Sequence, residues 1–147
     1  MLLKGLKVIE LASVLADPDV GMFFAEMGAN VIKIENMASG GDVTRSWKIA
    51  SENPKSQVSA YFSSVNWCKT YISLNLRDNS DKKKAYELIT NTDIVIVNFK
   101  PGDDVKLGMD YHTLKSYNPN LIYGEINGYG KTNNRSAYDV VLQAETG

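Results

Sequence analysis

The chain has 147 residues, of which 44% are hydrophobic, so it is long enough to form one domain with a core of its own. Its 16 basic residues are balanced by 17 acidic residues, which excludes the basic excess that is typical of nucleic-acid-binding proteins. No apolar run reaches the roughly 20 residues of a membrane span. Lys7 and Glu10 interrupt the N-terminal apolar stretch and argue against a secretory signal.

The first part of the chain predicts a strand, a helix and a second strand. Residues 6–11 are mostly apolar and β-rich, as a strand buried on both faces is, and residues 31–34 form the second strand. Asp17 is a suitable helix cap, Pro18 suits the first helical position, and Gly28 is placed to end the helix. A helix between two parallel strands forms a right-handed βαβ unit.

That helix is expected to bury one apolar face. Four large apolar side chains recur at the spacing i, i+3, i+4, i+7 of a single helix face, namely Val20, Phe23, Phe24 and Met27. The following segment, 36–58, is rich in Asn, Ser, Gly, Lys and Pro, and it predicts a long loop with at most a short helix. Long loops in compact domains are often binding loops.

The rest of the chain alternates strands with helices. Strands are predicted at 71–76, 94–97 and 121–126, and helices at 81–90 and 111–117, with a further helix beginning within 138–146. This alternation predicts an α/β domain with a mostly parallel sheet. Ligands bind such sheets at the carboxyl ends of the strands, which here are followed by the loops 12–18, 35–47, 98–107 and 127–139.

Several side chains in these loops suit an extended, partly phosphorylated ligand. Residues 98–102 combine an Asn amide, an aromatic ring and backbone amides, although Pro and Gly there also satisfy an ordinary turn. Four basic residues lie in or near the loops, namely Arg45, Lys69, Lys100 and Lys106. They would neutralise phosphates, but each taken singly is more typical of a solvated surface charge.

Other chemistries find little support in the sequence. Glu35 ends the second strand, where dinucleotide enzymes place a ribose-binding acid, but the first βα turn has no G-x-G-x-x-G, which argues against an ordinary NAD site. The single histidine, His112, and single cysteine, Cys68, form no cluster of metal-ligand spacing, so no metal is expected. A lone cysteine cannot form an internal disulfide, which favours a cytoplasmic location.

A series of motifs gives the chain a family resemblance. The blocks occur in family order at residues 5–11, 24–35, 41–45, 61–62, 66–76, 98–102, 106–108, 118–123, 128–130, 138–139 and 143–144. In these blocks the chain resembles the class III CoA-transferases, the group that includes formyl-CoA transferase, carnitine CoA-transferase and alpha-methylacyl-CoA racemase. Each block alone is modest, but their shared order along residues 5–147 makes the resemblance specific.

The resemblance implies a Rossmann-like large domain that uses coenzyme A thioesters and carboxylic acids as substrates. In the family, two ring-shaped chains interlock as a homodimer, and an aspartate nucleophile carries the transfer. By this resemblance the aspartate lies beyond Gly147, and residues 1–147 are the N-terminal part of the CoA-binding domain. The isolated chain is therefore expected to be inactive. A non-catalytic CoA-binding module, or one subunit of a split enzyme, is the alternative.

The same resemblance implies roles for particular residues. The turn after the first strand would line the CoA and active-site cleft with Ser13, Val14, Leu15 and Ala16. Further CoA contacts are implied at Asn36, near the adenine end, and at Asn98, Phe99, Lys106 and Leu107. Tyr138 and Asp139 match residues that flank the reacting centre.

The chain also departs from the family pattern. Asp17 precedes Pro18 where relatives commonly have Gly, and Thr70 stands where a basic residue is usual. The racemase branch carries a His at the position of Tyr138, and racemisation needs a base there, so CoA transfer is favoured over racemisation. A nucleotide-dependent oxidoreductase is the third alternative, and the missing glycine motif argues against it.

Overall fold

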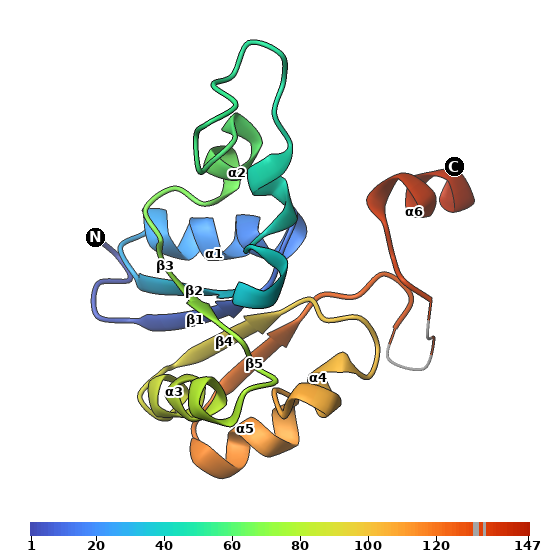
Figure 1. Cartoon of the computed structure of the whole chain (residues 1–147). Coiled ribbons are helices and arrows are strands. Elements are labelled where there is room, and N and C mark those ends of the chain that lie inside the picture. The colour runs from blue at the N-terminus through green and yellow to red at the C-terminus, as the bar shows by residue number, and fades with distance from the viewer. Residues whose placement is uncertain (131–132, 134) are drawn as a thin grey trace.

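The structure is a computed structural model that describes residues 1–130, 133 and 135–147. Its strands form a five-stranded parallel sheet with the order β3-β2-β1-β4-β5 (Figure 1). The strands are β1 (Lys7–Leu11), β2 (Asn30–Asn36), β3 (Thr70–Leu74), β4 (Ile94–Val97) and β5 (Ile122–Glu125). The predicted α/β class with a parallel sheet is confirmed.

Helices cover both faces of the sheet (Figure 1). Helix α1 (Ala16–Glu26) lies on one face, and α3 (Asn79–Thr90) and α5 (Tyr111–Tyr117) lie together on the other. The predicted helices at 81–90 and 111–117 are confirmed. Two short helices that the sequence did not predict complete the layers, α2 (Ala60–Val65) and α4 (Asp103–Leu107).

The core is divided by the sheet into two apolar clusters. Because side chains alternate along a strand, Val8 packs on the α1 side with Ala25, while Ile9 packs on the α3 side with Ile89. Val8 is 1% exposed and Ile9 is 2% exposed, so both faces of β1 are covered. This confirms the prediction of a strand buried on both faces.

Helix α1 differs from its prediction in its start and in its buried face. It begins at Ala16, with Leu15 at the N-cap and no side-chain cap, so the prediction that Asp17 caps the helix is wrong. Phe23, predicted to face inward, is 58% exposed. Val20 and Phe24 are partly buried and pack against the core as predicted, and the fully buried residues of the helix are Asp17, Pro18, Gly21 and Ala25. Small residues there let the helix approach the sheet closely, which large apolar side chains would prevent.

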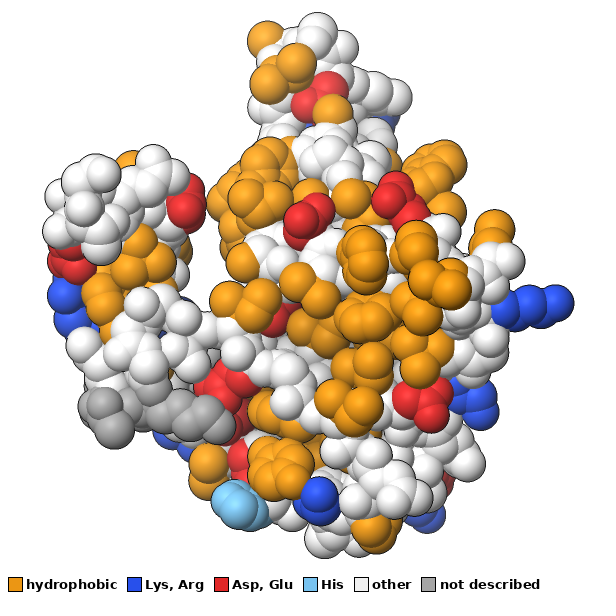
Figure 2. Space-filling view, turned by 180° about the vertical axis from the view of Figure 1, so that it is seen from behind, with side chains coloured by type: hydrophobic (Ala, Val, Ile, Leu, Met, Phe, Trp, Pro, Cys, Tyr) orange, Lys and Arg blue, Asp and Glu red, His pale blue; other side chains and the backbone are white. Residues whose placement is uncertain are grey.

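Two further segments extend from the sheet. Residues 36–58 hold two short 3-10 helices, η1 (Met37–Ser39) and η2 (Val43–Ser46), one more than the single short helix allowed for. Helix α6 (Asp139–Thr146) stands beside the rest of the protein and has no buried residue (Figure 2). On the rest of the protein, apolar side chains gather on the face shown in Figure 2. The predicted loop 127–139 is described except at positions 131, 132 and 134.

Candidate functional site

The order of the strands reverses between β1 and β4. The chain runs from β1 to β2 on one side, whereas β4 pairs with the other edge of β1. The loops that leave these two strands therefore diverge, and such a switch point at the carboxyl ends is where open α/β sheets bind ligands. Ser13 and Asn98 meet at this point. The Ser13 N–H donates to Asn98 Oδ1 (3.0 Å), and Asn98 Nδ2 donates to the Ser13 carbonyl (2.7 Å).

Side chains from elsewhere in the chain also form hydrogen bonds to the backbone on either side of Ser13. Lys33 Nζ donates to the carbonyl of Ala12 (2.6 Å), and the Val14 N–H donates to Asp42 Oδ1 (3.4 Å). Val14 has a φ of +73°, a left-handed conformation that is unusual for a β-branched residue. Strained backbone of this kind persists only where its surroundings fix it, and it clusters at functional sites.

Beneath the turn lies a buried ion network formed by Glu10, Lys33, Asp42 and Lys69. Lys33 Nζ lies 2.8 Å from Glu10 Oε1 and 3.0 Å from Asp42 Oδ2, and Lys69 Nζ lies 2.7 Å from Glu10 Oε2. None of these four side chains is more than 1% exposed. The network contains two cations and two carboxylates, so its charges balance, as buried charges require.

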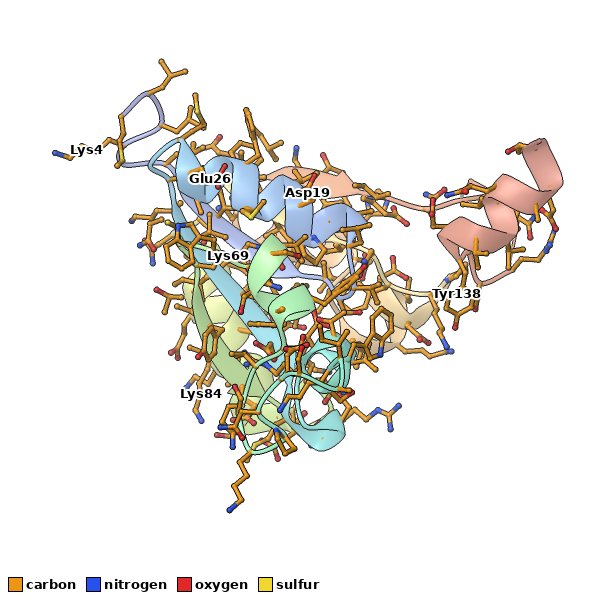
Figure 3. All side chains as sticks on the ribbon, turned by 90° about the horizontal axis from the view of Figure 1, so that it is seen from above. Lys4, Asp19, Glu26, Lys69, Lys84 and Tyr138 are labelled. Atoms are coloured by element: carbon orange, nitrogen blue, oxygen red, sulfur yellow. The ribbon has the colours of Figure 1, made fainter. Side chains whose placement is uncertain are left out.

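Lys69 is therefore neither a free phosphate ligand nor a solvated charge. Besides Glu10, it donates to the carbonyl of Pro18 (2.6 Å) and to Asn66 Oδ1 (3.1 Å), which ties β1 to the first turn of α1. Figure 3 shows Lys69 among the ribbons, whereas Lys4 projects from the edge of the molecule. Burial lowers the pKa of Lys69, and the charge of Glu10 opposes that shift.

The pKa values of two buried carboxyl groups near the turn are shifted in opposite directions. Burial acts to raise the pKa of Asp42, but Lys33 and the bonds from Thr44 outweigh it and hold the pKa below its usual value. For Asp17, burial and then the charge of Glu10 raise the pKa to about 7, and nearby Asn98 and Lys33 oppose this only in part. Neither carboxyl oxygen of Asp17 has a hydrogen-bond partner among the described residues.

Glu35 and Arg45 form a second, separate ion pair. Arg45 Nε donates to Glu35 Oε2 (2.7 Å), and the same oxygen accepts the Asp42 N–H (2.8 Å). The guanidinium also lies over the Phe62 ring, 3.8 Å from its centroid. The Glu35 carboxylate is thus bound to Arg45 and to the backbone of Asp42. Because Arg45 also donates to the Gln57 carbonyl (3.2 Å), it joins both ends of the long loop to Glu35 at the end of β2.

The remaining residues expected to contact CoA lie around the same edge of the sheet. The Asn36 side chain accepts the Ala38 N–H (3.0 Å) and caps η1. Phe99 packs partly buried on the α3 side of the core, while Lys106 is exposed and pairs with Asp103 (3.0 Å). Of these residues, Phe99 lines a hollow of about 220 Å³, together with Pro101, Gly102, Asp104, Val105, Glu125, Asn127 and Gly130.

Tyr138 and Asp139 are not gathered with the turn. Tyr138 is 60% exposed at the start of α6, and Asp139 Oδ2 accepts from Gln143 Nε2 (2.6 Å) within the helix itself. Figure 3 places Tyr138 beside α6, away from the sheet. The structure thus brings together the loops after β1, β2 and β4 and leaves this expected pair on a separate arm.

The sequence reasoning missed the ion network and Asp42. A signal for the network was present, because Glu10 lies inside the strand that was predicted to be buried on both faces and Lys33 lies inside the second predicted strand. Such charges are expected to be paired. Within the described residues, no group of three or more His, Cys, Asp or Glu side chains has a metal-binding arrangement. In that same part of the chain, no helix is long and apolar enough to cross a membrane.

Fold and site together define an α/β protein with a rigid turn at the switch point of a parallel sheet. The sequence profile of CoA-transferase family III matches residues 3–147, and the chain belongs to this family. It is 39% identical to a succinate–glutarate CoA-transferase of Agrobacterium fabrum, over 99% of this chain and 38% of that protein. It is 36% identical to an acetyl-CoA:oxalate CoA-transferase of Acetobacter aceti, over 97% of this chain and 36% of that protein.

A solved structure agrees with these matches. The crystal structure of a CAIB/BAIF family protein from Brucella suis superposes with a TM-score of 0.86 at 39% identity, covering 97% of this chain and 38% of that one. The chain therefore spans about a third to two-fifths of the length of the relatives it matches.

Proposed function

We propose that this chain is the N-terminal, CoA-binding part of a class III CoA-transferase, which moves CoA from an acyl-CoA to a carboxylic acid. The observation that carries the proposal is the turn 12–15, whose backbone is fixed by Lys33, Asn98 and Asp42 at the switch point of the sheet. Family membership supports it, as do relatives whose names describe CoA transfer to or from dicarboxylic acids.

In this proposal the turn and the neighbouring loops bind CoA. Ser13, Val14, Leu15 and Ala16 line the cleft, and Leu15 and Ala16 are exposed there. The other CoA contacts are Asn36, Asn98, Phe99, Lys106 and Leu107, and Tyr138 and Asp139 flank the reacting centre when the cleft is complete. Homodimer formation and a cytoplasmic location belong to the same proposal, and no metal takes part.

The chemistry of the proposed reaction is covalent catalysis by an aspartate that lies beyond Gly147. Its carboxylate attacks the acyl-CoA carbonyl and forms a mixed anhydride, and the C–S bond breaks to release the CoA thiolate. The thiolate attacks the aspartyl carbonyl, which gives an enzyme thioester and frees the donor acid. The acceptor carboxylate attacks the carbonyl of the enzyme thioester, which expels the CoA thiolate and gives a second mixed anhydride. The thiolate then attacks the acyl carbonyl of this anhydride, which forms the new acyl-CoA and regenerates the aspartate carboxylate. Dividing one difficult step into several easier ones is the advantage of such catalysis.

Two alternatives differ in what they require. An alpha-methylacyl-CoA racemase-like enzyme needs a base at the position of Tyr138, where the racemase branch carries a His, so transfer is favoured. A non-catalytic CoA-binding module, or a subunit of a split enzyme, would keep the turn 12–15 but would not perform transfer in any longer form of the protein.

Isothermal titration calorimetry with CoA tests the binding site. We expect weak binding, because later residues and a second chain complete the family's cleft, and we expect Asn98→Ala and Lys106→Ala each to weaken it several-fold. Lys115→Ala, which removes an exposed lysine on α5, is the control and should have no effect. Submicromolar binding that survives both substitutions would show that the site lies elsewhere. Transfer of CoA by this chain alone would contradict the position of the nucleophile.

A further inference from the structure

The conformation of Val14 is the feature that the proposed binding role leaves unexplained. A φ of +73° is unfavourable for a valine, whereas a glycine would adopt it without a steric penalty. The neighbouring groups of the turn are fixed by other side chains, Ala12 by Lys33 and Ser13 by Asn98. Within the part of the chain that the structure describes, the acceptor for the Val14 N–H is Asp42 Oδ1.

Asp42 is itself fixed from both sides. Its Oδ1 accepts the N–H of Thr44 (3.0 Å) and the Thr44 hydroxyl (2.8 Å) in addition to the Val14 N–H. Its Oδ2 lies 3.0 Å from Lys33 Nζ, and its backbone N–H donates to Glu35. These contacts hold the carboxylate with Oδ1 directed at the turn.

We propose that Asp42 is a positioning residue that holds Val14 in its left-handed conformation, so that the turn 12–15 is already shaped for CoA before the ligand arrives. This inference rests on the proposed function, because CoA is the ligand that the turn is proposed to bind. Asp42 acts through the backbone of Val14 and makes no contact with CoA. A preorganised turn binds more tightly because no ordering has to accompany binding.

The buried ion network connects this arrangement to the core. Lys33 joins Asp42 to Glu10 on β1, and Lys69 joins Glu10 to the Pro18 carbonyl at the start of α1. The turn is thus held between two points of one rigid network, at Ala12 and at Val14. Through this network, Asp42 on the loop after β2 fixes the backbone conformation of Val14 in the loop after β1.

Amide hydrogen exchange followed by NMR, together with CoA titration, tests the inference. We expect Asp42→Ala to speed exchange of the Val14 amide at least tenfold and to weaken CoA binding at least tenfold. Asp42→Asn keeps an oxygen that can accept the Val14 and Thr44 bonds, so it should keep Val14 exchange within about threefold. Asp78→Ala removes a comparable carboxylate cap from α3, far along the chain from the turn, and is the matched control.

The outcomes separate this inference from the proposed function. If Asp42→Ala leaves Val14 exchange and CoA affinity within twofold of the wild type, or if Asp78→Ala weakens CoA binding equally, the positioning role is overturned. If Asp42→Ala does not fold, Asp42→Asn decides, since Val14 exchange as fast as in an unfolded chain would contradict the role of the oxygen. If the wild type binds no CoA, the proposed function fails, while the exchange measurement still shows whether Asp42 holds Val14.

Discussion

At the scale of single residues, the site is built from charges placed where water cannot reach them. Glu10 and Lys33 each interrupt an apolar strand, and each is compensated by a partner from another segment. Asp17 is the exception, since it is 0% exposed and its carboxyl oxygens have no hydrogen-bond partner in the described residues. An uncompensated buried carboxyl is stable mainly in its protonated form.

Asp17 predicts a distinct dependence of stability on pH. Its pKa is raised from 3.8 to about 7 in the folded protein, so between these values the folded state holds a proton that the unfolded state has released. Below pH 3.8 Asp17 is protonated in both states and does not lower the free energy of unfolding. As the pH rises from 3.8 to about 7, Asp17 lowers the free energy of unfolding progressively, and above about pH 7 the loss is constant. A shift of this size corresponds to a cost of about 4 kcal/mol.

We expect Asp17→Asn to remove this dependence. The gain over the wild type should grow by about 4 kcal/mol between pH 4 and pH 8, and the buried amide without partners lowers the gain by the same amount at every pH. Urea denaturation at several pH values measures the difference, and Asp19→Asn, exposed on the same helix, is the control. A gain that is equal at pH 5 and pH 8 would contradict the buried, uncompensated carboxyl.

The ion network predicts unequal effects for two lysines. Lys69→Met leaves Glu10 without one of its two cations in the interior, so we expect a loss of roughly 3 kcal/mol in the free energy of unfolding. Lys84→Met breaks an exposed pair with Asp81 and should cost less than about 0.5 kcal/mol. Chemical denaturation of both variants provides the comparison, and similar small losses would show that the network contributes little.

At the scale of elements, the close approach of α1 to the sheet depends on its small residues. Gly21 lies directly over the Glu10 carboxylate and the Lys69 ammonium, so a side chain at this position would collide with the network. Ala is normally favoured over Gly within a helix by about 1 kcal/mol. Here we expect the opposite, with Gly21→Ala destabilising by about 2 kcal/mol or more because the network must shift.

Thermal denaturation of Gly21→Ala measures this effect. Glu26→Ala changes an exposed residue of the same helix and should leave the melting temperature nearly unchanged. A stabilised Gly21→Ala variant would mean that helix propensity outweighs the contact with Glu10, and that α1 lies farther from the sheet than the structure has it.

Element by element, the sequence was most informative where a pattern is purely local. The apolar run of β4 was predicted at residues 94–97, which are its bounds, because few alternatives bury four consecutive β-branched residues. Helix α4 was missed because it has only five residues, two acidic and one basic, and no apolar periodicity. On α1, Val20 and Phe24 pack against the core as predicted and Phe23 does not. The helix also covers the ion network, which was not predicted because it joins residues far apart in the sequence, such as Glu10 and Lys69.

The same distinction applies to the candidate site. The loops after β1, β2 and β4 were predicted to meet because parallel strands present their carboxyl ends at one edge. The contacts within the site were not predictable, because the bonds that the Val14 N–H donates to Asp42 and the Ser13 N–H donates to Asn98 join residues 28 and 85 positions apart. The predicted CoA contacts themselves remain predictions.

At the scale of the whole molecule, apolar surface stays uncovered. Figure 2 shows apolar side chains gathered on one face. Large exposed side chains include Phe23 on α1 (58%), Ile122 on the edge strand β5 (61%) and Val140 on α6 (72%). Surfaces of this kind promote association, and an edge strand adds unpaired backbone groups. We therefore expect the chain to self-associate.

Sedimentation velocity over a range of concentrations tests this expectation. The mean sedimentation coefficient should rise with concentration, and Ile122→Lys, which places a charge on the edge strand, should reduce that rise several-fold. Lys4→Glu changes an exposed charge away from the sheet edge and is the control. A chain that remains monomeric at every concentration would contradict the expected association.

CoA binding at the turn 12–15 is the proposal on which the other proposed residue roles depend. NMR chemical-shift mapping of the ¹⁵N-labelled chain during titration with CoA tests it most directly, and it detects weak binding. We predict that the largest shifts occur at the amides of Ser13, Val14, Leu15 and Ala16, with further shifts at Asn98 and Phe99. Shifts that are absent, or that gather at the amino ends of the strands around Lys7 and Asn30, would contradict the claim.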